Sequence, residues 1–253
     1  MILLKLGGSV VTDKSKPRSI RVDVIKRLAL EIKESGKKLV VVHGGGSFGH
    51  PIASKYGIQD GLKDSSQRIG VVKTRMAMED LNQRIVRIFS DAGLPAVSIQ
   101  TSAVFICEDK RIKKADIEIV EGFLKLGFMP VLYGDVVLDR SLGVSILSGD
   151  QITAFLAREL HPERVILATD VDGVLDDKGR LIEHISPGAG LSGLGRIASS
   201  KADVTGGMKG KAEELLRLAK GGTPSIVLNA MEEERLKNAL LGKRTKGTAF
   251  EVD

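Results

Sequence analysis

Short apolar runs alternate with amphipathic segments along the whole chain. Runs with the length and composition of buried strands occur at Ile2–Leu6, Leu39–His43, Ala96–Ile99, Pro130–Tyr133, Arg164–Ala168 and Ser225–Leu228. Continuous apolar runs such as 39–42 are typical of strands that are covered on both faces. Because helical segments lie between the runs, the pattern predicts an α/β fold, a three-layer αβα sandwich with a mostly parallel central sheet.

The helical segments are recognised by apolar residues that recur every three to four positions. This period holds in segments 22–33, 151–160, 209–219 and 232–241. It also holds from Ile69 to Phe89 within the longer segment Lys63–Ala92. That segment predicts one long helix, or two consecutive helices, near the substrate side, with most of its apolar side chains in the core. The part from Met76 to Phe89 is expected to contribute to an apolar substrate pocket.

Two glycine-rich stretches interrupt the alternation. Gly134–Ser148 has short alternating segments with glycine punctuation, and we interpret it as a β-hairpin added to the main sheet. Pro187–Gly195 is rich in small residues and predicts a loop that covers a ligand or is mobile. The sequence contains no internal repeat and no clear linker, so residues 1–253 are expected to form a single domain.

Composition narrows the class of protein. The chain has 253 residues, of which 42% are hydrophobic, enough for a sizeable core. No apolar stretch approaches the roughly 20 residues that cross a bilayer, and the apolar N-terminus is too short for a secretory signal, so we expect a cytoplasmic protein without a membrane partner. A single cysteine, Cys107, excludes an internal disulfide and a zinc cluster of cysteines.

The net charge of +6 favours an anionic partner without identifying it. Aromatic residues make up 4% of the chain and tryptophan is absent, which argues against base stacking on single-stranded nucleic acid. The one dense basic run, 110–114, predicts a solvated loop or hairpin tip. We therefore expect a small anionic substrate and no nucleic acid.

Three glycine-bearing turns follow or precede the predicted elements. Lys5-Leu6-Gly7-Gly8-Ser9 ends the first strand, Gly44-Gly45-Gly46 ends the second, and Ser148-Gly149-Asp150 opens a helix. Ligands of open α/β sheets bind at the carboxyl ends of the strands, where glycine lets backbone amides approach a phosphate. No segment matches the Walker P-loop or the G-x-G-x-x-G dinucleotide motif.

Several ionisable side chains accompany these turns. His50 follows the triple glycine by four residues and can donate a directional ring N–H to a phosphate, the alternative being a packing or capping role beside Pro51. Asp150 can act as a helix N-cap, orient lysines, or do both. Asp170 and Asp172 could ligate Mg²⁺, although the sequence does not favour a paired metal site. His43, at a strand end, is expected to be structural.

In this order, the motifs resemble the amino acid kinase family. The resemblance rests on Lys5–Ser9, Gly44–Gly46, Gly149-Asp150, Thr169–Val174 and Thr205–Lys209, which together span nearly the whole chain. Within the family, the continuation of the glycine turn into Ser47-Phe48-Gly49-His50 is similar to that of isopentenyl phosphate kinases. The resemblance implies an acceptor-phosphate side at roughly 1–148 and an ATP side at roughly 149–253.

The resemblance also implies a role for each matching residue. The catalytic residues would be Lys5, Lys14, His50, Asp150 and Lys209, with Lys14 at the transferring group and Asp150 orienting the lysines. The ATP-binding residues would be Lys5, Gly7, Gly8, Ser9, Gly46, Asp170, Leu175, Lys178, Gly179, Gly206 and Lys209. The acceptor phosphate would lie at Gly45, His50 and Gly149, and no protein residue is assigned as a metal ligand.

The activity implied by this resemblance is transfer of a phosphoryl group from ATP, with Mg²⁺, to isopentenyl phosphate, an alkyl phosphate of isoprenoid biosynthesis. Alternatives are a uridylate or fosfomycin kinase of the same family, or a non-catalytic nucleotide-sensing protein on this fold. Family likeness further suggests a homodimer.

Overall fold

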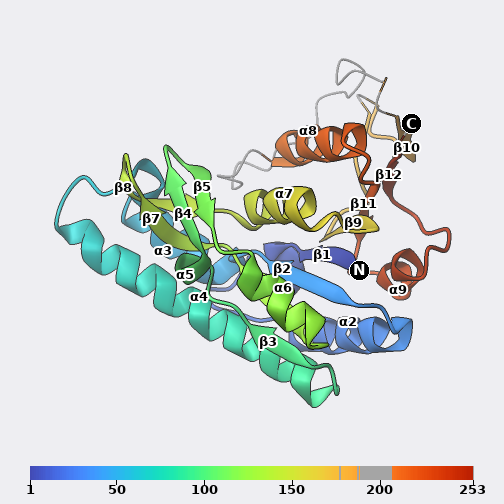
Figure 1. Ribbon diagram of the computed structural model, residues 1–253, viewed down its shortest axis with the longest axis horizontal. Coiled ribbons are helices and arrows are strands. Elements are labelled where there is room, and N and C mark those ends of the chain that lie inside the picture. Colours follow the sequence, from blue (N-terminus) through green and yellow to red (C-terminus); the bar gives the residue numbers. More distant parts are fainter. Residues whose placement is uncertain (177, 187, 189–206, 253) are drawn as a thin grey trace.

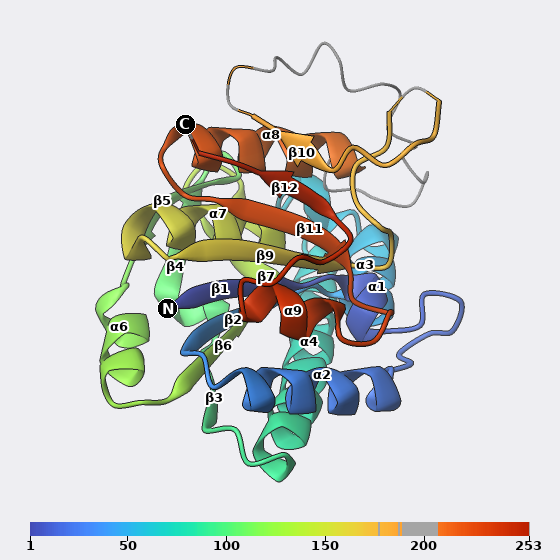
Figure 2. The same cartoon turned by 90° about the vertical axis from the view of Figure 1, so that its right-hand side faces the viewer.

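Strand β1 (Ile2–Leu6) lies inside an eight-stranded sheet, the centre of the computed structural model of the protein. The structure describes residues 1–176, 178–186, 188 and 207–252, with the side chains of 207–209 excepted. The strand order is β10-β12-β11-β9-β1-β2-β6-β3, which can be followed in Figure 2. The other strands of this sheet are β2 Leu39–His43, β3 Ala96–Ser98, β6 Met129–Tyr133, β9 Arg164–Thr169, β10 His184–Ile185, β11 Ser225–Asn229 and β12 Thr248–Phe250.

Neighbouring strands of this sheet are parallel, except that β11 and β12 are antiparallel. All six apolar runs identified in the sequence form strands, with ends that differ by one residue at most. In β1, β2 and β6 every residue is buried, because helices cover both faces. Leu6 pairs with His43 and with Ala168, so the carboxyl ends of β1, β2 and β9 lie at one edge.

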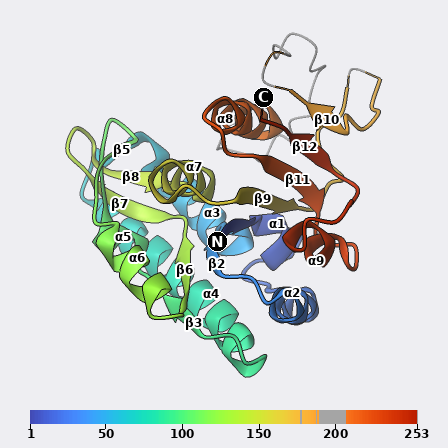
Figure 3. The same cartoon turned by 45° about the vertical axis from the view of Figure 1, so that its right-hand side comes forward.

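Helices cover the two faces of the sheet and complete the predicted three-layer sandwich (Figures 1 and 3). One hydrophobic core joins Ile2, Leu4 and Leu6 of β1 to helices α2, α3, α4 and α9. A second core joins Leu3, on the opposite face, to α6, α7 and α8. These helices are α2 Val22–Ser35, α3 Gly46–Lys55, α4 Ser66–Asp91, α6 Glu118–Lys125, α7 Gly149–Leu160, α8 Gly207–Lys220 and α9 Arg235–Leu240.

The predicted hairpin forms, but it does not join the main sheet. Strands β7 (Asp135–Asp139) and β8 (Gly143–Leu147) pair with each other and, through β4 (Phe105–Glu108) and β5 (Arg111–Ala115), make a separate four-stranded sheet. Figure 1 shows this sheet beside the main one. The prediction was wrong on this point because the pairing of β4 with β7 joins segments about 30 residues apart, which local patterns do not reveal.

The basic run 110–114 lies mostly on an edge strand. Lys110 is in the β4–β5 turn, as predicted for a hairpin tip, whereas Arg111 to Lys114 belong to β5. Charged side chains on an edge strand oppose edge-to-edge pairing with another sheet.

Segment Lys63–Ala92 forms one continuous helix, α4. Leu81, Ile85 and Phe89 are completely buried, as predicted, but Ile69, Val72 and Met76 are 55%, 52% and 61% exposed. The prediction that Met76 packs inward was therefore wrong. Helix α4 packs against α3 and β7 on one side, and Ile69, Val72 and Met76 lie on its exposed face.

The remaining short elements are α1 Gly8–Val11, η1 Ile58–Asp60 and α5 Thr101–Val104. Loop 187–195, predicted to cover a ligand or to be mobile, lies outside the described residues except for Gly188. No helix in the described part of the chain is both long and apolar enough to cross a membrane.

Candidate active site

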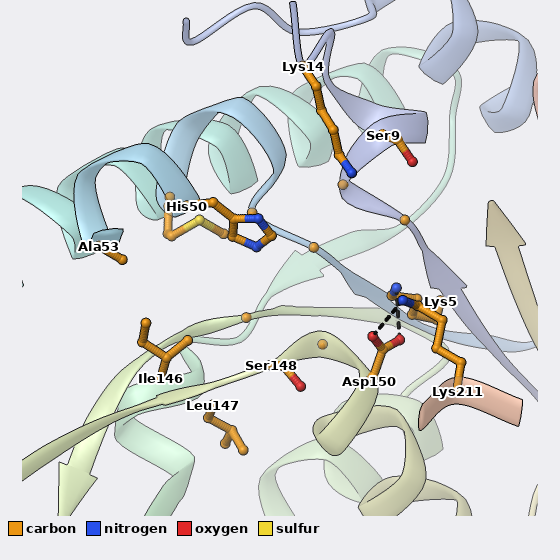
Figure 4. Close-up of a pocket in the computed structure, with 18 of the residues that line it drawn as sticks. Lys5, Ser9, Lys14, His50, Ala53, Ile146, Leu147, Ser148, Asp150 and Lys211 are labelled. Carbon is orange, nitrogen blue, oxygen red and sulfur yellow. Dashed lines mark ion pairs between the residues drawn. The ribbon is translucent and has the colours of Figure 1, made fainter. Parts of the chain in front are cut away.

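A cavity of about 340 Å³ opens at the edge of the sheet where β1, β2, β6 and β9 end. Figure 4 shows its side chains, which come from elements far apart in the sequence. Residues predicted for the site that line this cavity are Lys5, Gly7, Gly8, Ser9, Lys14, Gly45, His50, Gly149, Asp150, Asp170 and Leu175. The fold thus brings most of the predicted residues of both phosphate-binding sides into one cavity.

Asp150 forms ion pairs with two lysines at the centre of the cavity. The Lys5 Nζ atom is 2.9 Å from Asp150 Oδ1, and the Lys211 Nζ atom is 3.5 Å from Asp150 Oδ2. The side chains of Lys5 and Lys211 are only 6% and 11% exposed, so water screens these charges weakly. Two cations held by one carboxylate leave a net positive charge, which suits a polyanionic ligand.

The N-terminus of α7 fixes the Asp150 carboxylate. The N-cap of this helix is Ser148, not Asp150: the Ser148 hydroxyl accepts the Gln151 N–H, and the Gln151 side chain accepts the Ser148 N–H. This capping box leaves Asp150 in the first turn, where the positive end of the helix dipole stabilises its negative charge. Its side chain is thereby available to the lysines.

Lys211 was not among the residues predicted for the site. Lys209, which was, lies in the first turn of α8, but its side chain is outside the described part of the structure, as is all of Gly206. Positions i and i+2 of an α-helix are about 200° apart around its axis, so the direction of the Lys211 side chain gives no information about that of Lys209. The sequence contains both lysines within Thr205–Lys211 and gives no local signal that distinguishes them.

The glycine turns that follow β1 and β2 contact each other through their backbones. A Cβ atom built on Gly8 would lie 2.6 Å from the Gly46 nitrogen, and one built on Gly44 would lie 2.9 Å from the Gly8 nitrogen. Gly46 has a φ of +46°, a conformation that glycine adopts without strain. Glycine is thus required here because the two turns approach so closely that side chains cannot fit between them.

His50 and Lys14 enter the cavity from separate segments. His50 is on α3, whose N-terminal amides follow the Gly45 N-cap, and its Cδ2 atom is 3.4 Å from the Cβ position of Gly45. Lys14 belongs to the loop that follows α1 and is exposed. Figure 4 shows the imidazole of His50 and the ammonium group of Lys14 on the same side of the cavity as Ser9. A phosphate bound there would meet both groups.

The part of the cavity beyond His50 is largely apolar. Its lining includes Ala53 on α3, Thr74 and Met78 on α4, and Val136 and Ile146 on the β7–β8 hairpin. The Met78 sulfur lies 2.7 Å from the Cβ position of Gly49, so the thioether packs directly under the glycine turn. This wall was predicted within Met76–Phe89, and the residues of α4 that line the cavity are Thr74 and Met78.

Asp135 is a third carboxylate at the cavity, and it was not predicted from the sequence. Its side chain is completely buried, and burial raises its pKa to about 6, although the Val136 N–H and the Arg75 guanidinium lower it. The Arg75 Nε atom is 3.7 Å from Asp135 Oδ2. No local pattern marks this residue, which is simply the first residue after Gly134 at the end of β6.

His43 is structural, as expected. It is fully buried beneath the glycine turn, where its ring stacks on Tyr133 with centroids 5.5 Å apart. Burial lowers its pKa to about 4, so the ring is neutral at pH 7. The Asn82 amide contacts Nε2 at 3.2 Å, and Nδ1 contacts the Gly44 carbonyl oxygen at 3.1 Å.

The turn after β9 carries two aspartates with different environments. Asp170 lines the cavity, whereas Asp172 is bound by Arg235 and Lys246, each at 2.6 Å, and by Asn229 at 3.2 Å. The hydrogen bonds from Lys246 and Arg235 hold the pKa of Asp172 well below its usual range. Asp172 therefore anchors the turn to the C-terminal segment and has little capacity left for a metal ion.

Three of the residues predicted to bind nucleotide do not line the cavity. Lys178 and Gly179 lie in the tight loop between Leu175 and Leu181, where the Asp176 side chain accepts the Lys178 N–H at 2.9 Å. Gly46 instead contacts Gly8 and Thr12. Among the described residues no cluster of three or more His, Cys, Asp and Glu side chains could hold a metal ion.

Comparisons with known proteins show the family to which the chain belongs. A sequence profile described as the amino acid kinase family matches residues 1–229. The chain is 42% identical to the isopentenyl phosphate kinase of Methanothermobacter thermautotrophicus over 98% of both proteins. It is 38% identical to the isopentenyl phosphate kinase of Methanocaldococcus jannaschii, over 100% of this chain and 98% of that one.

Solved structures show the same likeness. An X-ray structure of an isopentenyl phosphate kinase superposes with a TM-score of 0.86 at 38% identity, covering 98% of this chain and 99% of the other. The similarity thus extends over the whole sandwich and both sides of the cavity.

Proposed function

The chain belongs to the amino acid kinase family, and we propose that it transfers the γ-phosphoryl group of ATP to isopentenyl phosphate, forming isopentenyl diphosphate. The observation that carries the proposal is the composition of the cavity at the sheet edge. One end has the lysines and glycine amides that polyphosphates require, and the other has His50 followed by an apolar wall. A substrate with a phosphate head and a short hydrocarbon tail matches that division.

On the donor side, we assign the ATP phosphates to the turn Gly7-Gly8-Ser9, with Lys5 and Lys211 as counter-charges. Lysines act on phosphates as point charges, and the Asp150 carboxylate fixes the positions of both. Asp170 and Leu175 border the remaining space on this side and would contact the nucleoside. Roles for Lys178, Gly179, Gly206 and Lys209 stay predictions.

On the acceptor side, we assign the phosphate to Gly45, His50 and Gly149. Gly45 is the N-cap of α3, so the positive end of the helix dipole lies at this position, and the His50 ring supplies a directional donor. The alkyl tail would extend between Met78 and Ile146. We also propose that, apart from the ATP-phosphate turn at residues 5–9, residues 1–148 mainly bind the acceptor and residues 149–253 mainly bind ATP.

The reaction assigned to this site needs no general base from the protein. A phosphate monoester has a second pKa of about 6, so near neutral pH it is a dianion and a competent nucleophile. The barrier comes from bringing two anions together, and a loose phosphoryl transition state is helped by alignment and charge neutralisation. Lys14, Lys5 and Lys211 supply that neutralisation along the line of transfer.

Mg²⁺, when bound to ATP, neutralises part of the phosphate charge. Because Asp172 is held by Arg235 and Lys246, we propose that the ATP phosphates themselves would hold the ion, with no protein carboxylate assigned as its ligand. ATP as donor and the single cysteine fit a cytoplasmic location, which we include in the proposal.

We also propose a homodimer formed through α4. Ile69, Val72 and Met76 occur at positions i, i+3 and i+7, and each is more than half exposed. These residues therefore form an apolar stripe on one face of the helix, which a second copy of the chain would cover. Analytical ultracentrifugation of Val72→Lys should give a monomer where the wild type gives a dimer. A wild-type monomer at micromolar concentration would contradict the dimer.

The activity is tested by a panel of acceptors with labelled ATP. We expect phosphorylation of isopentenyl phosphate at a kcat/KM at least 100-fold above that for uridine monophosphate or fosfomycin. Faster turnover of either of these would assign the cavity to another kinase of the family. ATP binding without transfer to any acceptor would indicate a nucleotide-sensing protein.

A further inference from the structure

The two glycine turns of the active site are joined by the hydroxyl group of Thr12. This residue is completely buried and ends the short helix α1. Its Oγ1 atom donates a hydrogen bond to the Gly8 carbonyl oxygen at 2.7 Å and accepts one from the Ser47 N–H at 3.0 Å. One side chain thus bonds to the turn after β1 and to the turn after β2.

The hydroxyl group fills a narrow space between the two turns. A Cβ atom built on Gly46 would lie 2.0 Å from Thr12 Oγ1 and 2.6 Å from the Gly8 carbonyl oxygen. Because Gly46 has no side chain, the Thr12 hydroxyl group can occupy this space. Because closely packed interiors transmit strain, a displacement of one glycine turn would displace the other.

Thr12 is also bound through its backbone, which limits its own movement. Its N–H donates to the Gly8 carbonyl oxygen at 2.9 Å, and its carbonyl oxygen accepts from the Arg21 side chain at 3.1 Å. The loop that carries Lys14 begins at the next residue. Thr12 therefore determines the relative positions of three segments that surround the space between the two phosphate sites.

We propose that Thr12 is a positioning residue that sets the spacing between the donor-phosphate turn and the acceptor-phosphate turn. The inference rests on the proposed function, because it concerns transfer between two bound phosphates. Phosphoryl transfer depends on alignment, and a misplacement of about 1 Å can cost about 100-fold in rate. Each substrate alone contacts mainly one side, so its affinity does not depend on the spacing.

The test compares Thr12→Val, which removes the hydroxyl at nearly constant shape, with Thr12→Ser, which keeps it. Thr101→Val is the matched control: Thr101 is also completely buried, and its hydroxyl also donates to a carbonyl oxygen and accepts an N–H, both of Tyr133. Calorimetry with a non-hydrolysable ATP analogue and with isopentenyl phosphate measures each affinity separately. Hydrogen exchange of the Ser47 amide reports on the hydrogen bond itself.

We expect Thr12→Val to lower kcat by about 10- to 100-fold, with both dissociation constants within about threefold of wild type and faster exchange at Ser47. Thr12→Ser should retain kcat within about threefold, and Thr101→Val should lose stability without this loss of kcat. If Thr12→Val does not fold, Thr12→Ala removes the same hydrogen bonds without adding a methyl group.

Three results would overturn the inference: an unchanged kcat in Thr12→Val, an equal loss of kcat in Thr12→Ser, or an equal loss in Thr101→Val. A wild-type protein that does not phosphorylate isopentenyl phosphate would instead contradict the proposed function. In that case the exchange rate at Ser47 and the two affinities still report whether Thr12 joins the turns.

Discussion

The Lys5 ammonium and the Asp150 carboxylate form a buried ion pair, 2.9 Å apart, between the end of β1 and the start of α7. The two residues are separated by more than half of the chain, and Lys211 joins them from a third segment, α8. This carboxylate holds two buried cations in place before any phosphate is bound. Preorganised charge of this kind is what a phosphoryl transfer site requires.

Replacing Asp150 by Asn should destabilise the free protein, because Lys5 and Lys211 would face each other without a counter-charge. Removal of one partner from a buried pair costs about 3 kcal/mol, and the partial exposure of Asp150 reduces this value. Bound phosphates would restore neutrality, so an ATP analogue should raise the melting temperature of the variant more than that of the wild type. Glu34→Gln, which removes an exposed ion pair with Lys237, is the control. If the ATP analogue raised the melting temperatures of Asp150→Asn and of the wild type equally, this explanation based on charge would be wrong.

Lys211→Met should lower kcat/KM for ATP by about 10- to 100-fold, because a charged hydrogen bond is worth about 1.5–3 kcal/mol. Lys209→Met, measured in parallel, tests the ATP-binding role that the sequence predicts for Lys209. Lys220→Met, at the exposed end of the same helix, serves as the control. A larger loss in Lys209→Met than in Lys211→Met would transfer the role to Lys209.

His50→Ala should reduce turnover of isopentenyl phosphate by about 100-fold and leave the dissociation constant of the ATP analogue unchanged, since the ring faces the acceptor side. Steady-state kinetics and calorimetry separate the two effects. His184→Ala removes an exposed histidine that pairs with Glu251 and should be neutral. Weaker ATP binding in His50→Ala would place the ring on the donor side.

Met78→Ala should let the enzyme accept longer alkyl phosphates, because it removes a side chain that lines the apolar end of the cavity. The cost in unfolding free energy should be about 2–4 kcal/mol, as for other buried methionines. Met76→Ala, two residues away but 61% exposed, should not alter the substrate profile. A longer-chain activity gained by Met76→Ala alone would contradict the position of the pocket.

The pH dependence of stability should contain two opposing contributions. Burial lowers the pKa of His43 from 6.5 to about 4, so the unfolded chain binds a proton that the folded chain does not, and stability falls as pH drops from 6.5 to 4. Burial raises the pKa of Asp135 from 3.8 to about 6, so the folded chain keeps its proton longer, and stability falls as pH rises from 3.8 to 6. Each contribution is about 3 kcal/mol at most.

Denaturant unfolding of Asp135→Asn and His43→Gln between pH 4 and pH 7 would separate these contributions. Relative to Asp135→Asn, the wild type should lose stability as the pH rises. Relative to His43→Gln, it should gain stability over the same range. If the unfolding free energies of the wild type and both variants changed with pH in parallel, neither Asp135 nor His43 would titrate with the shifted pKa.

The central strands β1, β2 and β6 could be predicted from the sequence because they are buried on both faces. A run such as 39–42 is apolar at every position, and this property is local, so its position needs no knowledge of the fold. The hairpin β7–β8 was also found from local signals, but its partner strand β4 was not. Strand pairing across a long loop depends on the packing of whole segments rather than on nearby residues.

Helix periodicity predicted α4 but not which of its methionines faces the cavity. The phase of a helix is fixed by what it packs against, and only the contact of α4 with α3 places Met78 beneath Gly49 and leaves Met76 exposed. For the same reason, the sequence does not show which position, 209 or 211, lies on the side of α8 that faces Asp150.

The sequence by itself determined the alternation of strands and helices and the positions of the glycine turns, because both follow from the properties of adjacent residues. Only the tertiary structure decided that Asp150 holds both Lys5 and Lys211, that Asp135 is a buried carboxylate, and that Thr12 joins Gly8 to Ser47. These relationships depend on the distance between atoms in space, which parallel strand register and helix phase establish only when the whole chain is packed.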